Sequence, residues 1–492
     1  MPDPIRPGHV SFDISFKKTA PPTPVDEDAP LRIAILGHFS GRADAAGSRP
    51  LLVDCDNFDS VCAQFAASLH LPACAAGTAE IDLAFKHLDD FHPDQLVKSV
   101  PALATLSDLR ARLLHPGSTE AAVAELRGIF KTGTPASASI TPGAPQQESA
   151  SDMVARLLGR PVTGPSAPAG PKSIVDQLIK QAVAPSTAPP PSPDQASLLA
   201  TLDSEISARL RRILHHPDFQ ALESTWRGLD FLVREAGENV KLHAIDISRE
   251  ELDRQISSLD NPAASTVGRQ LEPLVPAVIL GAFTFGTRDP GTLLRIARLA
   301  EACSTAFIGG AKPELLGCNS FGSQPNPLDW ATTTGADLNA FAELRRAPES
   351  IRIGLALPRF LIRQPYGKSG DPIQTLPFEE LAPGDSHECY LWANPAFLCG
   401  HLLLRSFASD GWDIELGGAG GEIGGLPVHS FRAGVEKETT PCAEAWLSEK
   451  AAEAILSRGL MPVLSVRGRD SVLLVSFRSI ADPARALPFR VG

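Results

Sequence analysis

The chain has 492 residues, of which 43% are hydrophobic and 21% are charged, so its length allows two or three domains with buried cores. The 57 acidic residues outnumber the 45 basic ones, and the net charge of −12 excludes a general attraction to nucleic acid or to an anionic membrane surface. No apolar run reaches the length of about 18 residues that a membrane helix needs, and the N-terminus lacks the pattern of a secretory signal. The eight cysteines include no Cys-x-x-Cys pair, which predicts reduced thiols, no metal centre and a soluble cytoplasmic protein.

The N-terminal part, residues 1–125, is expected to form a small α/β domain. Alternating apolar residues predict strands at 10–16, 31–36 and 81–85, and apolar residues at helical spacing predict a helix over 58–69. A further helix is expected from about residue 90, with Pro93 in its first turn and apolar positions continuing to Leu106.

Residues 126–196 are predicted to be a low-complexity linker. The segment is rich in Pro, Ala and Ser and carries too few apolar side chains to offset the entropy lost on folding. Two short amphipathic stretches, 153–158 and 174–179, interrupt it and are candidate docking helices.

The C-terminal part, residues 197–492, alternates helical and strand patterns. Strands are expected at 240–247, 277–281, 306–310, 351–357, 463–466 and 472–477, and helices at 198–213, 218–229, 293–302, 395–408 and 441–458. Such alternation predicts a layered α/β fold. The expected fold is therefore two layered α/β parts joined by a disordered Pro/Ala/Ser-rich linker.

Two segments have a weak resemblance to ligand-binding motifs. The glycine-rich loop Gly417–Gly425 could offer backbone N–H groups to a phosphate, but no Lys-Ser/Thr and no helix follow it, so a structural loop is favoured. His215 and His216 are adjacent, and adjacent side chains on a helix point about 100° apart, so the pair does not converge on one metal ion. A role at a helix terminus, near the negative end of the helix dipole, is the favoured interpretation.

No catalytic constellation is found in the sequence. Arg359 and Arg363 with Tyr366 could form an anion clamp, although ion pairs at a strand edge are the favoured interpretation. Cys318 and Ser320 lie in one loop, but the sequence identifies no candidate base that could activate either side chain. The protein is therefore not expected to be an enzyme or to hold a cofactor or metal.

Several ordered motifs resemble a known family. Residues 213–229, 316–321, 357–367, 390–396, 411–412 and 424–429 resemble the large contractile-sheath subunit of bacterial type VI secretion systems, the TssC family. Residues 33–41, 88–96 and 100–103 resemble the small sheath subunit, the TssB family. The chain is therefore similar to a fusion of both subunits.

This resemblance implies a structural role in the sheath. In the family the two subunits interlock through shared β-strands and stack into a tube around an inner tube, and contraction drives the inner tube outward. The implied partners are other sheath subunits, the inner tube protein, baseplate components and the AAA+ ATPase that dismantles the sheath. The side chains singled out within the motifs as candidate assembly residues are Trp226, Arg227, Arg359, Phe360, Arg363, Tyr366, Trp392 and Asn394.

Three questions stay open at this point. By position, Ile174, Val175, Leu178 and Ile179 correspond to the family's ATPase-docking helix, but they could equally dock on their own chain. The family's large subunit continues into an inner-facing domain beyond the region matching Ser479, so a sheath-associated cap, nucleator or regulator that does not polymerise is an alternative to a sheath subunit. A nucleotide-binding enzyme using Gly417–Gly425 is the least favoured alternative.

Overall fold

The computed structural model describes ten stretches of the chain: 28–42, 49–73, 80–115, 117–132, 193–259, 261–330, 336–382, 384–413, 420–433 and 436–489. The strand predicted at 10–16 and both amphipathic stretches of the predicted linker lie outside these residues. The protein is mixed α/β, with one compact unit formed by residues 1–104 and 205–492 and a second by residues 105–204.

The larger unit is built on a nine-stranded sheet in the order β11-β15-β14-β8-β7-β6-β1-β5-β2. The six strands from β14 to β5 run parallel, whereas β2, β15 and β11 are antiparallel to their neighbours. The bounds of these strands are β1 Leu31–Gly37, β2 Leu51–Val53, β5 Val240–Asp246, β6 Val278–Phe285, β7 Ala306–Ala311, β8 Ile353–Leu357, β11 Gly421–Ile423, β14 Met461–Ser465 and β15 Val472–Leu474. Three two-stranded ladders accompany the sheet: β3 Ser68–Leu71 with β4 Ile81–Ala84, β9 Phe360–Leu361 with β10 Trp392–Ala393, and β12 Ser430–Ala433 with β13 Glu436–Thr439.

Strand β1 lies inside this sheet. Its register with β5 runs from Leu31 opposite Val240 to Gly37 opposite Asp246, and its other edge pairs with β6. Apart from the partly exposed Arg32, the residues on both faces of β1 are buried, as expected for a central parallel strand. The prediction places residues 1–125 and 197–492 in separate domains, whereas the sheet contains strands from both of these segments.

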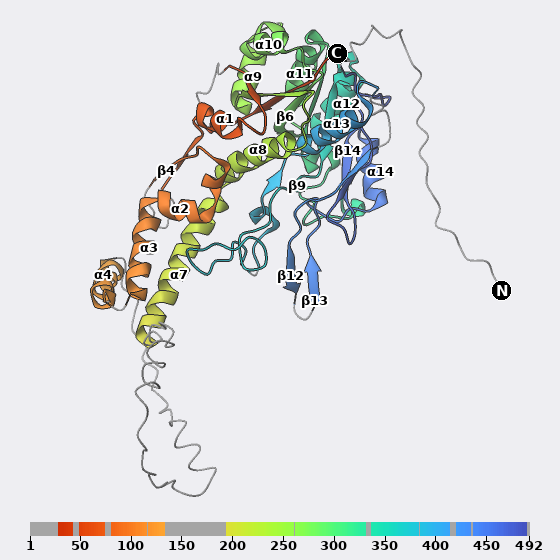
Figure 1. Cartoon of the computed structure of the whole chain (residues 1–492). Coiled ribbons are helices and arrows are strands. Elements are labelled where there is room, and N and C mark those ends of the chain that lie inside the picture. Colours follow the sequence, from red (N-terminus) through yellow and green to blue (C-terminus); the bar gives the residue numbers. More distant parts are fainter. Residues whose placement is uncertain are drawn as a thin grey trace, which may run out of the picture. The chain divides into compact units, whose positions relative to one another are not determined.

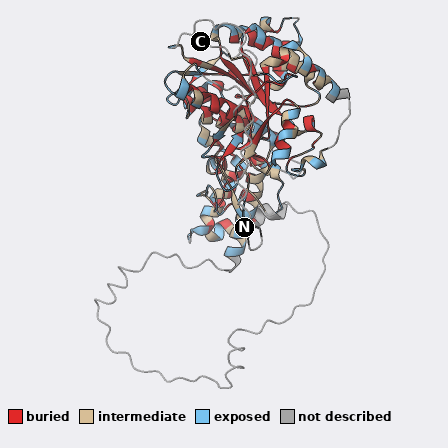
Figure 2. Ribbon diagram, turned by 90° about the vertical axis from the view of Figure 1, so that its right-hand side faces the viewer, coloured by how far each residue is buried: buried red, intermediate tan, exposed pale blue. Residues whose placement is uncertain are grey.

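Helices cover both faces of this sheet. The bounds of the helices in the described residues of both units are α1 Phe58–Phe65, α2 Pro93–Ser99, α3 Pro101–Leu114, α4 Thr119–Thr132, α7 Pro193–Leu214, α8 Pro217–Val233, α9 Arg249–Ser257, α10 Thr266–Leu271, α11 Pro290–Ala302, α12 Ala336–Arg346, α13 Ala396–Asp410 and α14 Glu449–Ser457. One face packs against α9, α10, α11, α12 and α14 through a continuous apolar cluster (Figure 1). On the other face, α13 packs against β6 and β7, and α8 packs against α13. The strands lie buried between these layers while the outer sides of the helices are exposed (Figure 2).

The structure corrects three predicted helices. The helix predicted over 58–69 ends at Phe65, because Ala66 adopts the left-handed conformation and the chain then enters β3. The helix expected from about residue 90 is two helices, since extended backbone at Val100 precedes Pro101. The helix predicted over 441–458 begins only after Ser448, whose side chain accepts a hydrogen bond from the N–H of Ala451.

The smaller unit is helical in the residues that the structure describes. It contains most of α3, together with α4 and the first half of α7. The Arg110 guanidinium contacts the Asp203 carboxylate at 2.5 Å, and the Gln195 amide donates to the carbonyl of Leu113. These contacts join α3 to α7. Across the described residues of the whole protein, no helix is both long and apolar enough to cross a membrane.

Candidate functional site around the Tyr366 loop

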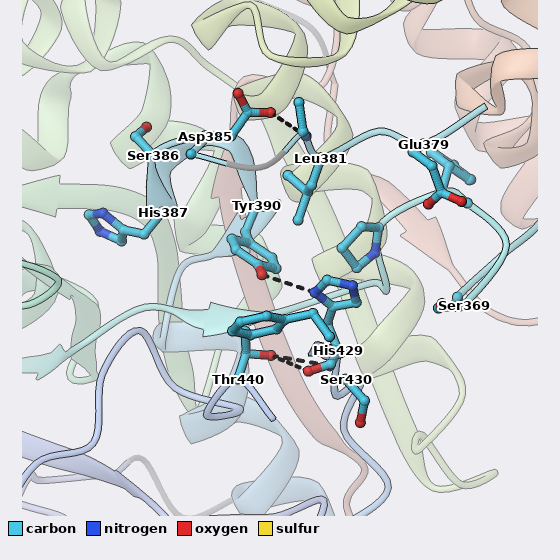
Figure 3. Close-up of a pocket in the computed structure, with 17 residues that line it drawn as sticks. Ser369, Glu379, Leu381, Asp385, Ser386, His387, Tyr390, His429, Ser430 and Thr440 are labelled. Carbon is cyan, nitrogen blue, oxygen red and sulfur yellow. Dashed lines mark hydrogen bonds between the residues drawn. The ribbon is translucent and has the colours of Figure 1, made fainter. Parts of the chain in front are cut away.

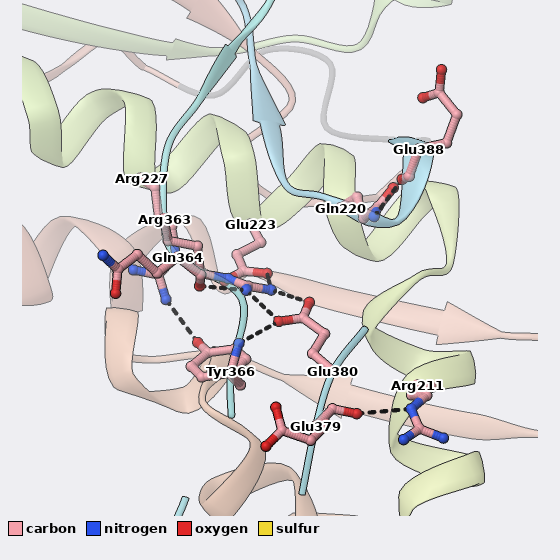
Figure 4. A network of polar contacts seen from close by, with 10 residues as sticks. All are labelled: Arg211, Gln220, Glu223, Arg227, Arg363, Gln364, Tyr366, Glu379, Glu380 and Glu388. Carbon is pink, nitrogen blue, oxygen red and sulfur yellow. Dashed lines mark hydrogen bonds and ion pairs between the residues drawn. The ribbon is translucent and has the colours of Figure 1, made fainter. Parts of the chain in front are cut away.

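A buried ion network forms where the segment after β9 crosses α8 (Figure 4). The guanidinium of Arg363 donates to Glu223 of α8, with Nε 2.7 Å from Oε1, and to Glu380, with Nη1 2.7 Å from Oε2. Arg363 is 8% exposed, and the Glu223 and Glu380 side chains are 0% and 1% exposed. Two carboxylates are therefore held inside the protein by one planar cation that binds both.

Tyr366 and Arg227 complete this network. Arg227 lies one helical turn after Glu223 on α8, with its Nε 2.7 Å from Glu223 Oε1, and it donates from Nη2 to the hydroxyl of Tyr366. The backbone N–H of Tyr366 donates to Glu380, and the Arg363 guanidinium lies over the Tyr366 ring at 4.1 Å. The two arginines and two glutamates balance in charge.

The electrostatics of the network follow from burial and pairing. Burial alone would raise the pKa of Glu223, but Arg363 and Arg227 hold it below its usual value. Burial disfavours the Arg363 cation, yet Glu223 and Glu380 raise its pKa well above the ordinary value. Both groups stay charged at neutral pH. The network therefore holds α8 against the segment 363–380, which is called the Tyr366 loop below.

A second charged cluster surrounds Arg359. Its guanidinium contacts Glu444 at 2.5 Å and Glu388 at 3.0 Å, and His387 Nε2 lies 3.0 Å from Glu444. Burial opposes the charge on Glu444, but the hydrogen bonds from His387 and Arg359 lower its pKa to about 2. Hydrogen bonding to Glu444 also raises the pKa of His387. Both arginines of the predicted motif are thus taken up in ion pairs, which confirms the favoured interpretation over an anion clamp.

A cavity of about 920 Å³ opens beside these clusters (Figure 3). Its walls come from the segment 365–386 and from residues near the β12–β13 ladder. The Tyr390 hydroxyl lies 2.9 Å from His429 Nδ1. Burial raises the pKa of Tyr390 to about 12 and lowers the pKa of His429, so both are neutral at pH 7 and the contact is an ordinary hydrogen bond.

Cys318, in the loop 316–321, is not an activated nucleophile. Cys318 is fully buried, and burial raises the pKa of its thiol to about 11. Its Sγ lies 3.8 Å from the carbonyl of Gln324, an acceptor that stabilises the protonated thiol.

The remaining candidate assembly residues make contacts within the chain. Trp226 is fully buried and donates to the carbonyl of Phe39 at 2.9 Å, and Trp392 donates to the carbonyl of His387. Asn394 donates to the carbonyl of Phe283, while Phe360 lies buried in β9. These contacts connect separate elements of the fold, and a part in assembly stays a prediction for all eight residues.

The other predicted sites have mixed outcomes. Of the loop Gly417–Gly425, residues 417–419 lie outside the described part, and Gly421–Ile423 form the edge strand β11 paired with β15. His215 and His216 follow the C-terminal, negative end of α7, where their N–H groups donate to the carbonyls of Arg211 and Ile213, and His216 also caps α8, its Nδ1 accepting from the N–H of Asp218. Ile174, Val175, Leu178 and Ile179 lie outside the described residues.

Sequence reasoning missed the acidic half of both clusters. Glu223 was detectable, because it precedes Arg227 by four residues on one helix. Glu380 and Glu444 lie far from their partners in the sequence, and no local pattern distinguishes them from exposed glutamates.

Comparison with known proteins decides the family. The model of VipB, described as "EvpB/VC_A0108, tail sheath N-terminal domain", matches residues 196–481, more than half of the chain. The chain belongs to this tail-sheath family. Residues 12–128 match a second model, "Type VI secretion system, VipA, VC_A0107 or Hcp2". The chain therefore joins a VipA-like and a VipB-like part, and it is a member of the type VI secretion sheath subunits.

A named relative supports this assignment. The type VI secretion system sheath protein TssC1 of Pseudomonas aeruginosa is 32% identical over 308 residues, which cover 58% of this chain and 61% of the relative. The match thus spans less than two thirds of the relative's length. The VipB model and the relative are both described as sheath proteins.

Proposed function

We propose that this protein is a structural subunit of a type VI contractile sheath in which one chain supplies both the small and the large sheath parts. It assembles with copies of itself or with other sheath subunits around an inner tube, and contraction of that assembly drives secretion. Its partners are the inner tube protein, baseplate components and an AAA+ ATPase, it works in the cytoplasm, and it carries out no catalysis. Family membership and the order of the two matched parts support this proposal.

The observation that carries the proposal is the position of β1. This strand belongs to the VipA-like part, and it pairs along its whole length with β5 of the VipB-like part and also with β6. A force-transmitting subunit needs its two parts to move as one body, and hydrogen-bonded strands in a buried sheet provide such a connection.

A second contact between the parts strengthens this argument. The Trp226 ring of α8 packs at 5.2 Å from Phe39, 5.7 Å from Phe58 and 6.1 Å from Phe65, measured between ring centroids. All three phenylalanines belong to the VipA-like part and are buried. Large buried aromatic rings contribute heavily to packing energy, so this cluster supports a single folded subunit.

Negative-stain electron microscopy of the purified chain, over a range of concentrations, tests the function. The proposal predicts tubes or rings of uniform diameter, either alone or when other sheath subunits are co-expressed. Single globular particles under all of these conditions would contradict a polymerising subunit and favour a cap, nucleator or regulator.

A further inference from the structure

Three metal-ligating side chains converge beside the junction of α7 and α8. His215 is the residue after α7, while Asp385 and Cys389 lie about 170 positions later in the segment before β10. One ligand atom from each, an imidazole nitrogen, a carboxylate oxygen and the thiol sulfur, lies within 4.8 Å of the other two. The fold therefore brings together N, O and S donors that no sequence motif connects.

His215 gives an independent indication that something is bound here. Its Nε2 atom is buried and has no hydrogen-bond partner. A buried polar atom without a partner costs free energy, and such an atom in a folded protein calls for an explanation such as a bound ion.

We propose that His215, Asp385 and Cys389 bind one zinc ion. Zinc takes histidine, cysteine and carboxylate ligands together, and with bonds of 2.0–2.3 Å a tetrahedral site places its ligand atoms about 3.3–3.8 Å apart. The present separations, within 4.8 Å, need only a small contraction to reach that geometry. On binding, the Cys389 thiol loses its proton to the buffer and the sulfur binds as thiolate; the fourth position is left to water or to a group from a partner.

The surroundings suit a structural ion. The Arg211 guanidinium donates to the carbonyl of Glu379, and the Gln220 amide donates to the carbonyl of Glu388, so the same segment is already tied to α7 before Asp385 and to α8 between Asp385 and Cys389 (Figure 4). A metal at His215 would hold this segment at two further residues, Asp385 and Cys389. The Asp385 carboxylate also accepts from the N–H of Ala382 at 2.7 Å, a contact of the kind that orients metal ligands.

A neighbouring cluster with similar residue types does not qualify. His387, Glu388 and Glu444 also bring ligand atoms within 4.8 Å, but the Arg359 guanidinium contacts both glutamates. A cation already occupies the space between the two carboxylates of that cluster. The charges that act on His215 are the carboxylates of Glu380 and Asp385 and the guanidiniums of Arg363 and Arg211. Arg363 pairs with Glu223 and Glu380, which leaves the Asp385 carboxylate and the Arg211 guanidinium as the other charges that act on His215.

Cobalt(II) titration of the full chain tests this site. The protein is freed of metal with a chelator, kept reduced, and titrated with cobalt(II), whose absorption reports thiolate ligation in the near ultraviolet and tetrahedral geometry in the visible. We expect one cobalt per chain with a thiolate band, displaced by one equivalent of zinc. Cys389→Ser should abolish the thiolate band, and His215→Gln should weaken zinc binding by more than about a hundredfold, the upper end of the loss seen when only a supporting contact is removed.

Matched variants make the result specific. Cys55→Ser removes an exposed thiol and His70→Gln an exposed imidazole, and neither should change the spectrum or the affinity. Circular dichroism of each variant checks that it folds. Three outcomes would overturn the proposal: no cobalt bound by the unaltered chain, a bound cobalt without a thiolate band, or a thiolate band that survives in folded Cys389→Ser.

Discussion

Replacing Arg363 with Met tests how the Tyr366 loop is held. The substitution keeps much of the side-chain volume but removes the cation that pairs with Glu223 and Glu380, both of which are almost fully buried. Arg227 still contacts Glu223, whereas Glu380 keeps only the backbone N–H of Tyr366. Breaking a buried ion pair by removing one partner typically costs about 3–5 kcal/mol, and we expect a loss in that range.

Urea denaturation at pH 7, followed by tryptophan fluorescence, measures this loss. Arg234→Met is the matched control, because Arg234 pairs with Asp230 on the surface and its side chain is 74% exposed. An exposed pair of this kind contributes about 0–1 kcal/mol. The double variant Arg363→Met with Glu380→Gln should be more stable than Arg363→Met alone, because Glu223 keeps Arg227 as its partner and no buried carboxylate is then left without a cation.

Two results would refute this reasoning. If Arg363→Met were no more destabilising than Arg234→Met, the buried network would contribute nothing to holding the loop. If the double variant lost at least as much stability as Arg363→Met, the loss would come from packing and not from an unpaired carboxylate.

Three further predictions concern single positions. Trp226→Phe leaves the buried carbonyl of Phe39 without its donor and should cost about 1–3 kcal/mol in urea denaturation; a neutral result would mean that this contact is dispensable. Gly228→Ala places a Cβ 2.3 Å from the Phe397 ring and should destabilise by about 1–3 kcal/mol, whereas an unchanged midpoint would show that α8 and α13 can separate freely. Glu444 has a pKa of about 2 in the folded protein against 4.5 ordinarily, so its charge stabilises the fold fully above pH 4.5, and about 3 kcal/mol of that stabilisation is lost as the pH falls to 2. Acid unfolding of Glu444→Gln, followed by circular dichroism, should lack this loss of stability. An acid-unfolding profile equal to that of the unaltered chain would contradict the prediction.

Local patterns in the sequence predict most of the elements of the larger unit. Strand β1 follows from an apolar run that ends at Gly37, and α9 follows from the capping serine Ser248. Helix α14 was predicted too long because the apolar residues before Ser448 are buried by other elements without being helical. Periodicity reports burial, and burial alone does not separate a helix from an irregular buried segment.

Long-range partners were beyond the reach of local patterns. The insertion of β1 between β5 and β6 joins residues about 200 positions apart, and no spacing rule specifies strand order in a sheet. The same holds for Arg363, where the sequence identifies the arginine and its tendency to form ion pairs, but Glu223 lies 140 residues away. The family motif at 357–367 identifies Arg359, Arg363 and Tyr366, but it does not show which residues they contact.

Cleavage between the two matched parts tests most directly whether they form one folded subunit. A protease site is introduced between residues 133 and 192, which lie between the VipA-like and VipB-like matches, and the purified chain is cut there. The structure predicts that both fragments co-elute in size-exclusion chromatography and unfold in a single urea transition. A cut protein carrying Ile35→Asp, which places a charge at a fully buried position of β1, should separate into its fragments. Fragments of the unaltered chain that separate under native conditions, or that unfold in two independent transitions, would contradict the account.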